Sequence, residues 1–308
     1  MWTKTIASRV ILELADQRRR IVSDWRIHVI ARRFSHADNA PLPDETKAIA
    51  IRKELVRRGD IASVEGVPDV YVVNVAYASL LEVSEEQIVQ EANPWAVFGF
   101  LTAMTHHGLT DVPAREVYAI TIKHKKQTDT VSQNERAERL PLGTMPDDWA
   151  DGIDLPCARQ PKRARDVAIN WTQLTHECGF GVMVGYSFGV AIYVTDVERT
   201  LLDALRMPDK SGGIAKVLQA WQSADDISIG KIISYTDNYN NQVLRQRVGF
   251  LLQKLGRHHP RLDEWRNGLQ RGGSIKLVAS SPYSETHSVA WNLSLNVPPT
   301  ILAILDGD

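Results

Sequence analysis

Apolar side chains recur every three or four positions along the first 60 residues, which is the spacing of a buried helical face. The pattern predicts a first helix over 6–17. A second helix is predicted to begin after Ser23, a favourable N-cap residue, and to continue to about Phe34. A long polar stretch with two prolines, 35–44, separates it from the next apolar pattern.

The third predicted helix spans residues 45–58 and has clear signals at both ends. Asp44 can cap its first turn, and Gly59 stands where a helix C-terminus favours a left-handed residue. Three apolar residues at helical spacing would face the core: Ala48, Ile51 and Leu55. The opposite face would carry residues that recur at three- and four-residue steps: Thr46, Ala50, Lys53 and Arg57.

Two β-like runs follow, 61–64 and 70–75, separated by the turn-forming sequence Glu65-Gly66-Val67-Pro68-Asp69. We expect them to form a β-hairpin. Three helices followed by a hairpin is the element order of a winged helix-turn-helix module. The sequence therefore predicts a winged-helix DNA-binding domain over residues 1–78.

Residues 79–308 predict a larger, mixed α/β domain, so the expected fold class is α+β. Asn93-Pro94 is a helix-start signal, and Gly108 would end that helix. Thr195 to Glu198 has the pattern of a capping box before another helix. Strands are predicted at 117–122, 167–171, 182–184 and 190–194, helices at 214–221, 229–235 and 243–255, and a β-like tail at 275–297. The polar stretch 123–165 predicts long surface loops without an assigned role.

The composition is that of a folded protein, because 44 % of the 308 residues are apolar and 24 % are charged. The length favours about two domains. The longest apolar run, 95–101, is far shorter than the ~20 residues of a membrane span. The chain does not begin with the charged-then-apolar pattern of a secretory signal. Its two cysteines, Cys157 and Cys178, are too few for a disulfide-stabilised secreted scaffold. We therefore expect a cytoplasmic protein without a membrane partner.

The formal net charge is −1, but the basic part of the chain lies at the N-terminus, where residues 1–75 hold 13 Lys and Arg against 10 Asp and Glu. DNA binding needs cations that neutralise phosphates and a helix that presents side chains to the major groove. The leading DNA contacts expected on helix 45–58 are Thr46, Lys47, Lys53 and Arg57. Arg52 and Arg58 would touch phosphates or remain on the surface. Further candidates for backbone contacts are Arg18–Arg20 and Arg32–Arg33, and the hairpin 61–75 would lie over the DNA backbone or the minor groove.

A serine hydrolase is an alternative, because Gly185-Tyr186-Ser187-Phe188-Gly189 matches the G-x-S-x-G nucleophile elbow. That elbow joins a strand to a helix, whereas here a second β-like run follows. The glycines are better explained as turn residues of a hairpin, so we expect no catalytic residue. The pairs His106-His107 and His258-His259 lack the spacing of metal ligands, and we expect neither a metal nor a cofactor.

Two segments carry a family resemblance. One runs from Ala92 to Asp111, through Asn93-Pro94-Trp95 and His106-His107-Gly108. The other is Val194-Thr195-Asp196-Val197-Glu198-Arg199-Thr200-Leu201-Leu202-Asp203-Ala204-Leu205, followed by Pro208 and Gly212-Gly213. With the N-terminal module, these segments resemble the AbiEi family of antitoxin-type transcriptional regulators from type IV toxin–antitoxin systems. The resemblance covers most of the chain, apart from 123–165.

The resemblance implies an N-terminal winged helix that binds inverted repeats in double-stranded DNA of its own promoter and represses the operon. It also implies a C-terminal domain, residues 79–308, that counteracts a nucleotidyltransferase-like toxin encoded alongside. A protein-binding module that neutralises a partner without specific DNA binding is an alternative. We interpret Glu198-Arg199-Thr200 as architectural, because Arg199 and Asp203 have the i, i+4 spacing of a helical ion pair.

Overall fold

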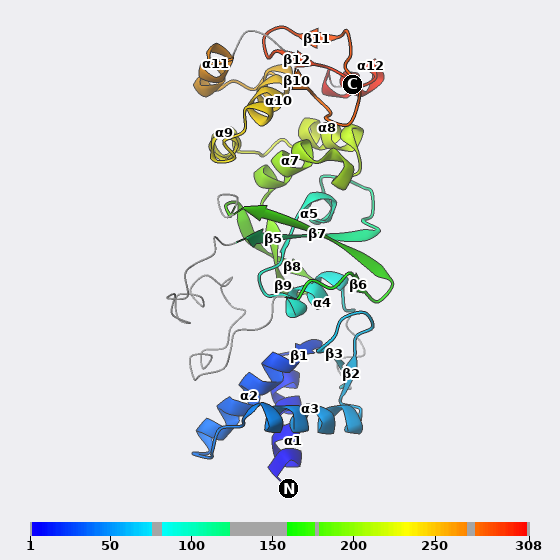
Figure 1. Ribbon diagram of the computed structural model, residues 1–308, viewed down its shortest axis with the longest axis vertical. Helices are drawn as coiled ribbons and strands as arrows, with labels where there is room; N and C mark the ends of the chain where they lie inside the picture. Colours follow the sequence, from blue (N-terminus) through cyan, green and yellow to red (C-terminus); the bar gives the residue numbers. More distant parts are fainter. Residues whose placement is uncertain (1, 76–81, 124–158, 176–178, 270–274, 307–308) are drawn as a thin grey trace. The chain divides into compact units, whose positions relative to one another are not determined.

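The computed structural model describes residues 2–75, 82–123, 159–175, 179–269 and 275–306 (Figure 1). Its fold is mixed α and β, with eleven α-helices and three β-sheets among these residues. The chain forms two compact units. Unit 1 comprises 1–96, 124–171 and 184–193, and unit 2 comprises 97–123, 172–183 and 194–308. The domain boundary expected after residue 78 falls outside the described residues.

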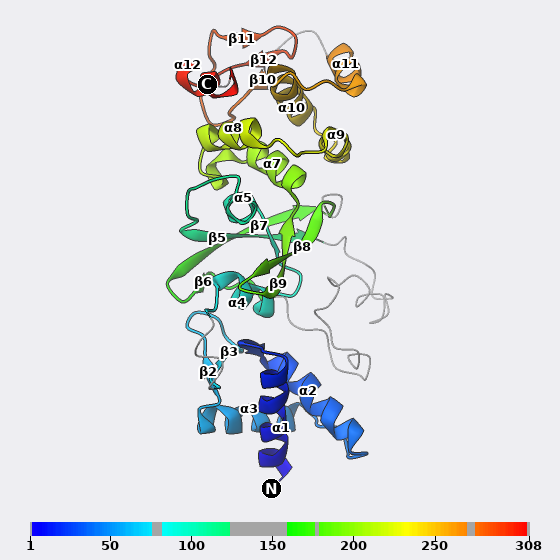
Figure 2. The same cartoon turned by 180° about the vertical axis from the view of Figure 1, so that it is seen from behind.

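Unit 1 begins with three helices that pack against one another, α1 (Trp2–Asp16), α2 (Asp24–Ala37) and α3 (Glu45–Arg58) (Figures 1 and 2). All three predicted helices are confirmed. The Ser23 hydroxyl caps α2 by accepting a hydrogen bond from the Arg26 backbone N–H at 3.3 Å. The Asp44 carboxylate caps α3 in the same way, at 2.8 Å from the Lys47 N–H. Gly59, with φ at 75°, ends α3 in the left-handed conformation, which costs glycine nothing.

A three-stranded antiparallel sheet accompanies the helices, in the order β1-β3-β2. The predicted hairpin is confirmed as β2 (Ile61–Ser63) and β3 (Val70–Val73). The sequence did not predict β1 (Ile21–Ser23), because three residues that follow a basic run and end at the helix cap Ser23 carry no strand pattern of their own. Its pairing partner, β3, lies far along the chain, with Ile21 opposite Val72.

The core of this region is apolar and holds α3 in place. Ala48, Ile51 and Leu55 are at most 8 % exposed, as predicted. Ile51 and Leu55 pack in one cluster with apolar residues of α1 and α2. Full burial of an Ile or Leu side chain contributes about 1.5–3 kcal/mol to folding. The fold is therefore secured by the inward face of α3, and its outward face is left for other roles.

The rest of unit 1 is built around α4 (Glu85–Ala92), whose N-cap is Ser84. The prediction that Asn93-Pro94 begins a helix was wrong. Asn93 ends α4, because its N–H donates to the Val89 carbonyl at 2.9 Å and its side chain accepts from the Trp95 N–H at 3.1 Å. This side-chain turn leads into β4 (Val97–Phe98), and the expected helix, α5 (Phe100–His106), begins only after that strand.

A six-stranded sheet has the order β6-β7-β5-β4-β9-β8. The four predicted strands are confirmed as β5 (Glu116–Lys123), β7 (Val167–Thr175), β8 (Val182–Ser187) and β9 (Val190–Thr195), and β6 is Arg163–Ala164. β4 pairs antiparallel with β5 and parallel with β9. Phe188 and Gly189, both with positive φ, form the turn between β8 and β9, so the G-x-S-x-G stretch is a hairpin as predicted.

In unit 2, α7 (Val197–Arg206) holds a buried charge cluster. Its N-cap is Asp196 rather than Thr195, one residue later than the capping-box prediction, with the Arg199 N–H donating to Asp196 at 2.8 Å. The predicted ion pair is confirmed, at 2.7 Å from Arg199 Nε to Asp203 Oδ2, with both side chains at most 2 % exposed. Asp203 also accepts a hydrogen bond from the Tyr239 hydroxyl. The motif therefore stabilises the interior of this unit.

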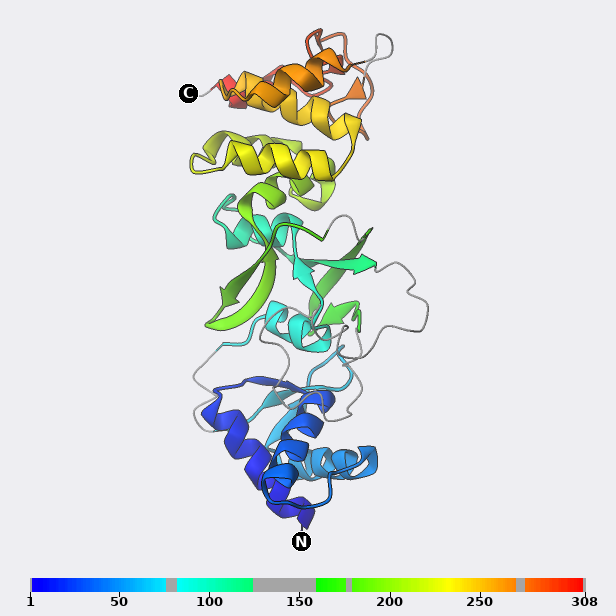
Figure 3. The ribbon, with the colours of Figure 1, turned by 90° about the vertical axis from the view of Figure 1, so that its left-hand side faces the viewer.

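Helices make up most of the remaining unit 2, and the three predicted helices are confirmed as α8 (Ile214–Ser223), α9 (Ile229–Asn238) and α10 (Gln242–Lys254). The yellow α9, the gold α10 and the orange α11 (Pro260–Asn267) lie side by side in Figure 3. The β-like tail forms only the two-residue strands β10 (Ile275–Lys276), β11 (His287–Ser288) and β12 (Leu293–Ser294), before α12 (Pro299–Leu302). Among the described residues, no helix combines the length and apolar character that crossing a membrane requires.

Candidate nucleic-acid interface

The exposed surface of α3 presents the four leading contact candidates. Thr46, Lys47, Lys53 and Arg57 are all exposed. Thr46, Lys53 and Arg57 lie on the side opposite the buried residues of this helix, whereas Lys47 lies nearer to them, with its Nζ 5.8 Å from the centre of the Trp2 ring. Two apolar side chains lie on the same exposed surface, Ile49 at 36 % and Val56 at 44 % exposure. An α-helix of this length is about 21 Å long at 1.5 Å per residue. It can therefore lay several of these side chains along the floor of a major groove that is ~12 Å wide.

The two cations at the C-terminal end of this face are only weakly engaged by the protein. Lys53 forms no ion pair with any residue that the structure describes. Arg57, 65 % exposed, donates to both carboxylate oxygens of Glu54 at 2.8 and 2.7 Å, and this hydrogen bonding lowers the pKa of Glu54. An exposed pair of this kind contributes little to stability. Arg57 can therefore exchange Glu54 for a phosphate at small cost.

Arg52 and Arg58 are used within the fold. Arg52 Nη1 lies 2.5 Å from the Asp24 carboxylate, and its side chain is 22 % exposed. Burial raises the pKa of Asp24, and Arg52 opposes that rise. Arg58 Nε lies 2.8 Å from Asp60, and its Nη1 donates to the Ser8 hydroxyl at 2.9 Å. These two arginines tie α3 to its neighbours, so the exposed cations of its outward face are Lys53 and Arg57, with Lys47 exposed nearer the Trp2 ring.

The turn of the β2–β3 hairpin, residues 65–69, contacts another part of unit 1. The Arg165 backbone N–H donates to the Glu65 carbonyl at 2.9 Å, and Arg159 forms an ion pair with Asp69. The hairpin was expected to lie over the DNA backbone or minor groove. Because this turn contacts the protein itself, the hairpin residues that remain exposed for contact with DNA include Ala62 and Ser63 on β2.

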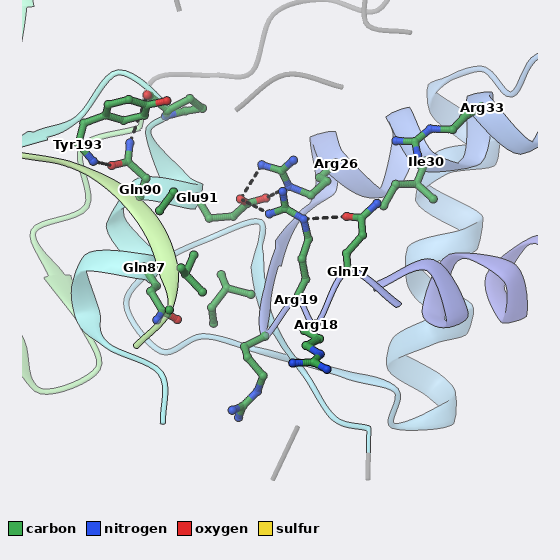
Figure 4. Close-up of a pocket in the computed structure, with 16 residues that line it drawn as sticks. Gln17, Arg18, Arg19, Arg26, Ile30, Arg33, Gln87, Gln90, Glu91 and Tyr193 are labelled. Atoms are coloured by element: carbon green, nitrogen blue, oxygen red, sulfur yellow. Dashed lines mark hydrogen bonds and ion pairs between the residues drawn. The ribbon is translucent and has the colours of Figure 1, made fainter. Parts of the chain in front are cut away.

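The basic run at the end of α1 belongs to a different feature. Arg18, Arg19 and Arg20 line a cavity of about 550 Å³, together with Arg26 and Arg33 (Figure 4). We call this cavity, with its five arginines, the arginine cavity. The sequence predicts Arg18–Arg20 only as candidates for DNA backbone contacts. It did not identify the acidic member of the lining, Glu91, because an acidic residue on an amphipathic helix gives no sign of burial.

The other candidate residues have structural partners. The Ser187 hydroxyl donates to the hydroxyl of Ser84 at 2.8 Å. His107 Nε2 lies 2.6 Å from the Thr195 carbonyl, and His259 Nδ1 accepts from the Arg261 N–H at 3.1 Å. Within the described ranges, no group of three or more His, Cys, Asp or Glu could hold a metal ion. Cys157 and Cys178 lie outside the described residues.

Comparison with known proteins identifies a solved structure with a similar fold. No protein-family model matches the sequence, and no curated protein matches it. Among solved structures, the chain is similar to the crystal structure of the Rv2827c protein from Mycobacterium tuberculosis, with a TM-score of 0.54. The sequences are 14 % identical, and the match covers 98 % of this chain and 95 % of that one. At this level of identity, the similarity describes the shared fold and nothing further.

Proposed function

We propose that the protein is a transcriptional autorepressor whose N-terminal winged helix-turn-helix binds its own promoter. The order of three helices and a hairpin, with the antiparallel sheet β1-β3-β2, supports this assignment. The observation that carries the proposal is the division of α3 into two faces. Its inward face is fixed in an apolar core, and its outward face presents Lys53 and Arg57 with few competing contacts.

In this proposal α3 enters the major groove. Lys53 and Arg57 neutralise phosphates or donate to guanine edges, and Thr46 and Lys47 act at the N-terminal end of the helix. The exposed side chains of Ile49 and Val56 suit contact with thymine methyl groups. Arg52 and Arg58 position the helix through their ion pairs with Asp24 and Asp60.

The antitoxin role rests on the resemblance to the AbiEi family. The segments that carry it, 92–111 and 194–205, include α5 and α7, where the motif residues are largely buried. Burial of Arg199 and Asp203 supports a scaffold role for this motif. The partner of the proposed antitoxin is a nucleotidyltransferase-like toxin encoded alongside.

Fluorescence anisotropy tests the repressor proposal, with duplex DNA from immediately upstream of the gene, a scrambled duplex and a salt series. The double variant Lys53→Gln/Arg57→Gln should bind the native duplex more weakly. If both residues contact phosphates, its log–log salt slope should fall by about 1.8, since each contact contributes about 0.9. Arg18→Gln/Arg19→Gln removes the same charge elsewhere in unit 1 and should bind DNA as the parent does. Equal weakening by both double variants, or by neither, would remove α3 as the reading element.

A second candidate function is a protein-binding module that neutralises its partner without specific DNA binding. It is favoured by β8, which lies at the edge of the six-stranded sheet. Val184, Tyr186 and Phe188, in and just after this strand, are 43, 65 and 62 % exposed. An exposed apolar sheet edge is a template for pairing with a strand of another chain. Under this alternative, Tyr186→Ser/Phe188→Ser would abolish co-purification with the toxin, and the parent would bind native and scrambled DNA equally weakly.

A further inference from the structure

The arginine cavity is partly open to solvent and has the size of a small-molecule site. Its walls come from the connection between α1 and β1, from α2 and α4, and from β9 with the turn before it, all within unit 1 (Figure 4). Its volume of about 550 Å³ lies within the range of about 300–1,000 Å³ that is common for ligand pockets. The lining combines five arginines and three glutamines with an apolar side formed by Ile21, Ile30, Pro94, Val190 and Ala191.

Among the described residues that line the cavity, arginines outnumber acids, with five arginines and one acid, Glu91. The Glu91 carboxylate is 8 % exposed and is taken up by Arg26, whose Nε and Nη2 donate to its two oxygens at 2.7 and 2.8 Å. Glu91 also accepts from the backbone N–H and the hydroxyl of Ser23. Arg33 is paired at 3.0 Å with Glu13, which does not line the cavity. The described lining holds no other acid beside Arg18 and Arg19.

Arg19 lines the cavity close to both Glu91 and Arg26. Its Nε donates to Gln17 at 2.9 Å, which orients the guanidinium, and its Nη1 is 3.8 Å from Glu91 (Figure 4). Burial, followed by the neighbouring charge of Arg26, lowers the pKa of Arg19 to about 10. Arg19 thus remains charged at neutral pH, in surroundings that an additional anion would stabilise.

The wall opposite the arginines is already held in place. Gln87 donates to the Ser187 carbonyl at 2.7 Å. Gln90 donates to the Ala96 carbonyl at 3.2 Å and accepts from the Tyr193 N–H at 2.9 Å. Because these buried amides are used in binding α4 to the β8–β9 hairpin, the cavity does not depend on a ligand to hold its shape.

We propose that the arginine cavity binds a small molecule that bears a phosphate group, with Arg18 and Arg19 as its principal anion ligands. The planar guanidinium fork matches phosphate oxygens and donates charge-assisted hydrogen bonds to them. The apolar side of the cavity would receive the remainder of such a molecule. This binding is separate from the proposed reading of DNA by α3 and does not require it.

Isothermal titration calorimetry of the full chain with inorganic pyrophosphate, at physiological ionic strength, tests the proposal. The parent should bind pyrophosphate, and Arg18→Gln/Arg19→Gln should raise the Kd about tenfold or more, the equivalent of one lost charge-assisted contact. The charge-matched control Lys53→Gln/Arg57→Gln should leave the Kd unchanged. The cavity variant keeps the Glu91–Arg26 pair, and an unchanged thermal unfolding curve would show that it folds.

Three results would overturn the proposal. The first is the absence of pyrophosphate binding to the parent. The second is an equal rise in Kd for both double variants, which would indicate attraction to net charge alone. The third is displacement of pyrophosphate by promoter duplex together with loss of DNA binding in Arg18→Gln/Arg19→Gln. That result would assign these arginines to the DNA backbone. The DNA assay with the α3 variant is read separately, so failure of either proposal can be recognised.

Discussion

Removal of the Asp203 carboxylate should destabilise unit 2 far more than an ordinary surface substitution. Asp203 is fully buried and accepts from Arg199 at 2.7 Å and from Arg206 at 3.1 Å. Asp203→Ala would leave Arg199, only 1 % exposed, without its carboxylate. Breaking a buried ion pair from one side costs about 3–5 kcal/mol.

We expect the loss to fall near the lower end of that range. Arg199 would keep its hydrogen bond to the Phe180 carbonyl at 2.6 Å, and its guanidinium lies 4.6 Å from the centre of the Phe180 ring. These contacts partly compensate the Arg199 guanidinium for the loss of the carboxylate. The expected decrease in the free energy of opening is therefore about 3 kcal/mol.

Amide hydrogen exchange measured on peptides from α7 and α10 is the appropriate assay, because it reports the opening of unit 2 without assuming that the two units unfold together. Asp209→Ala is the matched control. Asp209 is exposed, and its removal should change the opening free energy by less than about 0.5 kcal/mol. Adding Arg199→Met to Asp203→Ala should recover part of the loss, since it removes the unpaired charge. A loss below about 1 kcal/mol for Asp203→Ala, or no recovery in the double variant, would refute the reasoning.

Two further predictions concern a buried acid and a close glycine contact. Burial alone would raise the pKa of Glu91, but Arg26 outweighs it and holds the pKa below its ordinary value. The stability from this carboxylate is complete above its unfolded-state pKa near 4.3 and is lost as pH falls through the lower folded-state value. Urea unfolding should therefore show Glu91→Gln less stable than the parent at neutral pH, with a difference that shrinks in acid; a constant difference would contradict this. Gly249→Ala would place a Cβ 2.2 Å from the Trp291 ring and should cost about 1–3 kcal/mol, seen as a lower melting temperature and altered tryptophan fluorescence. Gly230→Ala, whose nearest contact would be 3.9 Å away, should not show this effect.

The sequence predicts best those elements whose signals are local. The bounds of α3 follow from Asp44 and Gly59, and its core residues follow from spacing, so the prediction and the structure agree there. The roles of its arginines could not be predicted in this way. Arg52 is engaged by Asp24 from the start of another helix, and only the folded chain brings that partner within 2.5 Å.

The burial of Glu91 also depends on a partner that is distant in the sequence. Its helix carries Glu85, Glu86 and Glu91, and nothing local distinguishes the one that is buried. Glu91 is the buried one because its carboxylate pairs with Arg26, which lies 65 positions earlier in the sequence. The arginine cavity was therefore not predictable from residue spacing, although the basic run that forms part of it was noted in the sequence.

The two basic features of unit 1 differ in how their charge is held, and this difference separates their proposed ligands. Lys53 and Arg57 are exposed on a helix surface, where their interactions with DNA phosphates are screened by salt. Of the two proposed anion ligands in the cavity, Arg18 is exposed, whereas Arg19 is partly withdrawn from water, with its side chain 29 % exposed, and donates to Gln17. Screening is weaker for the partly buried Arg19, and its hydrogen bond to Gln17 orients it before an anion arrives. Salt should therefore weaken DNA binding steeply and pyrophosphate binding more gently. A single salt series measured with both ligands distinguishes a surface that follows a polyanion from a cavity that selects one phosphate group.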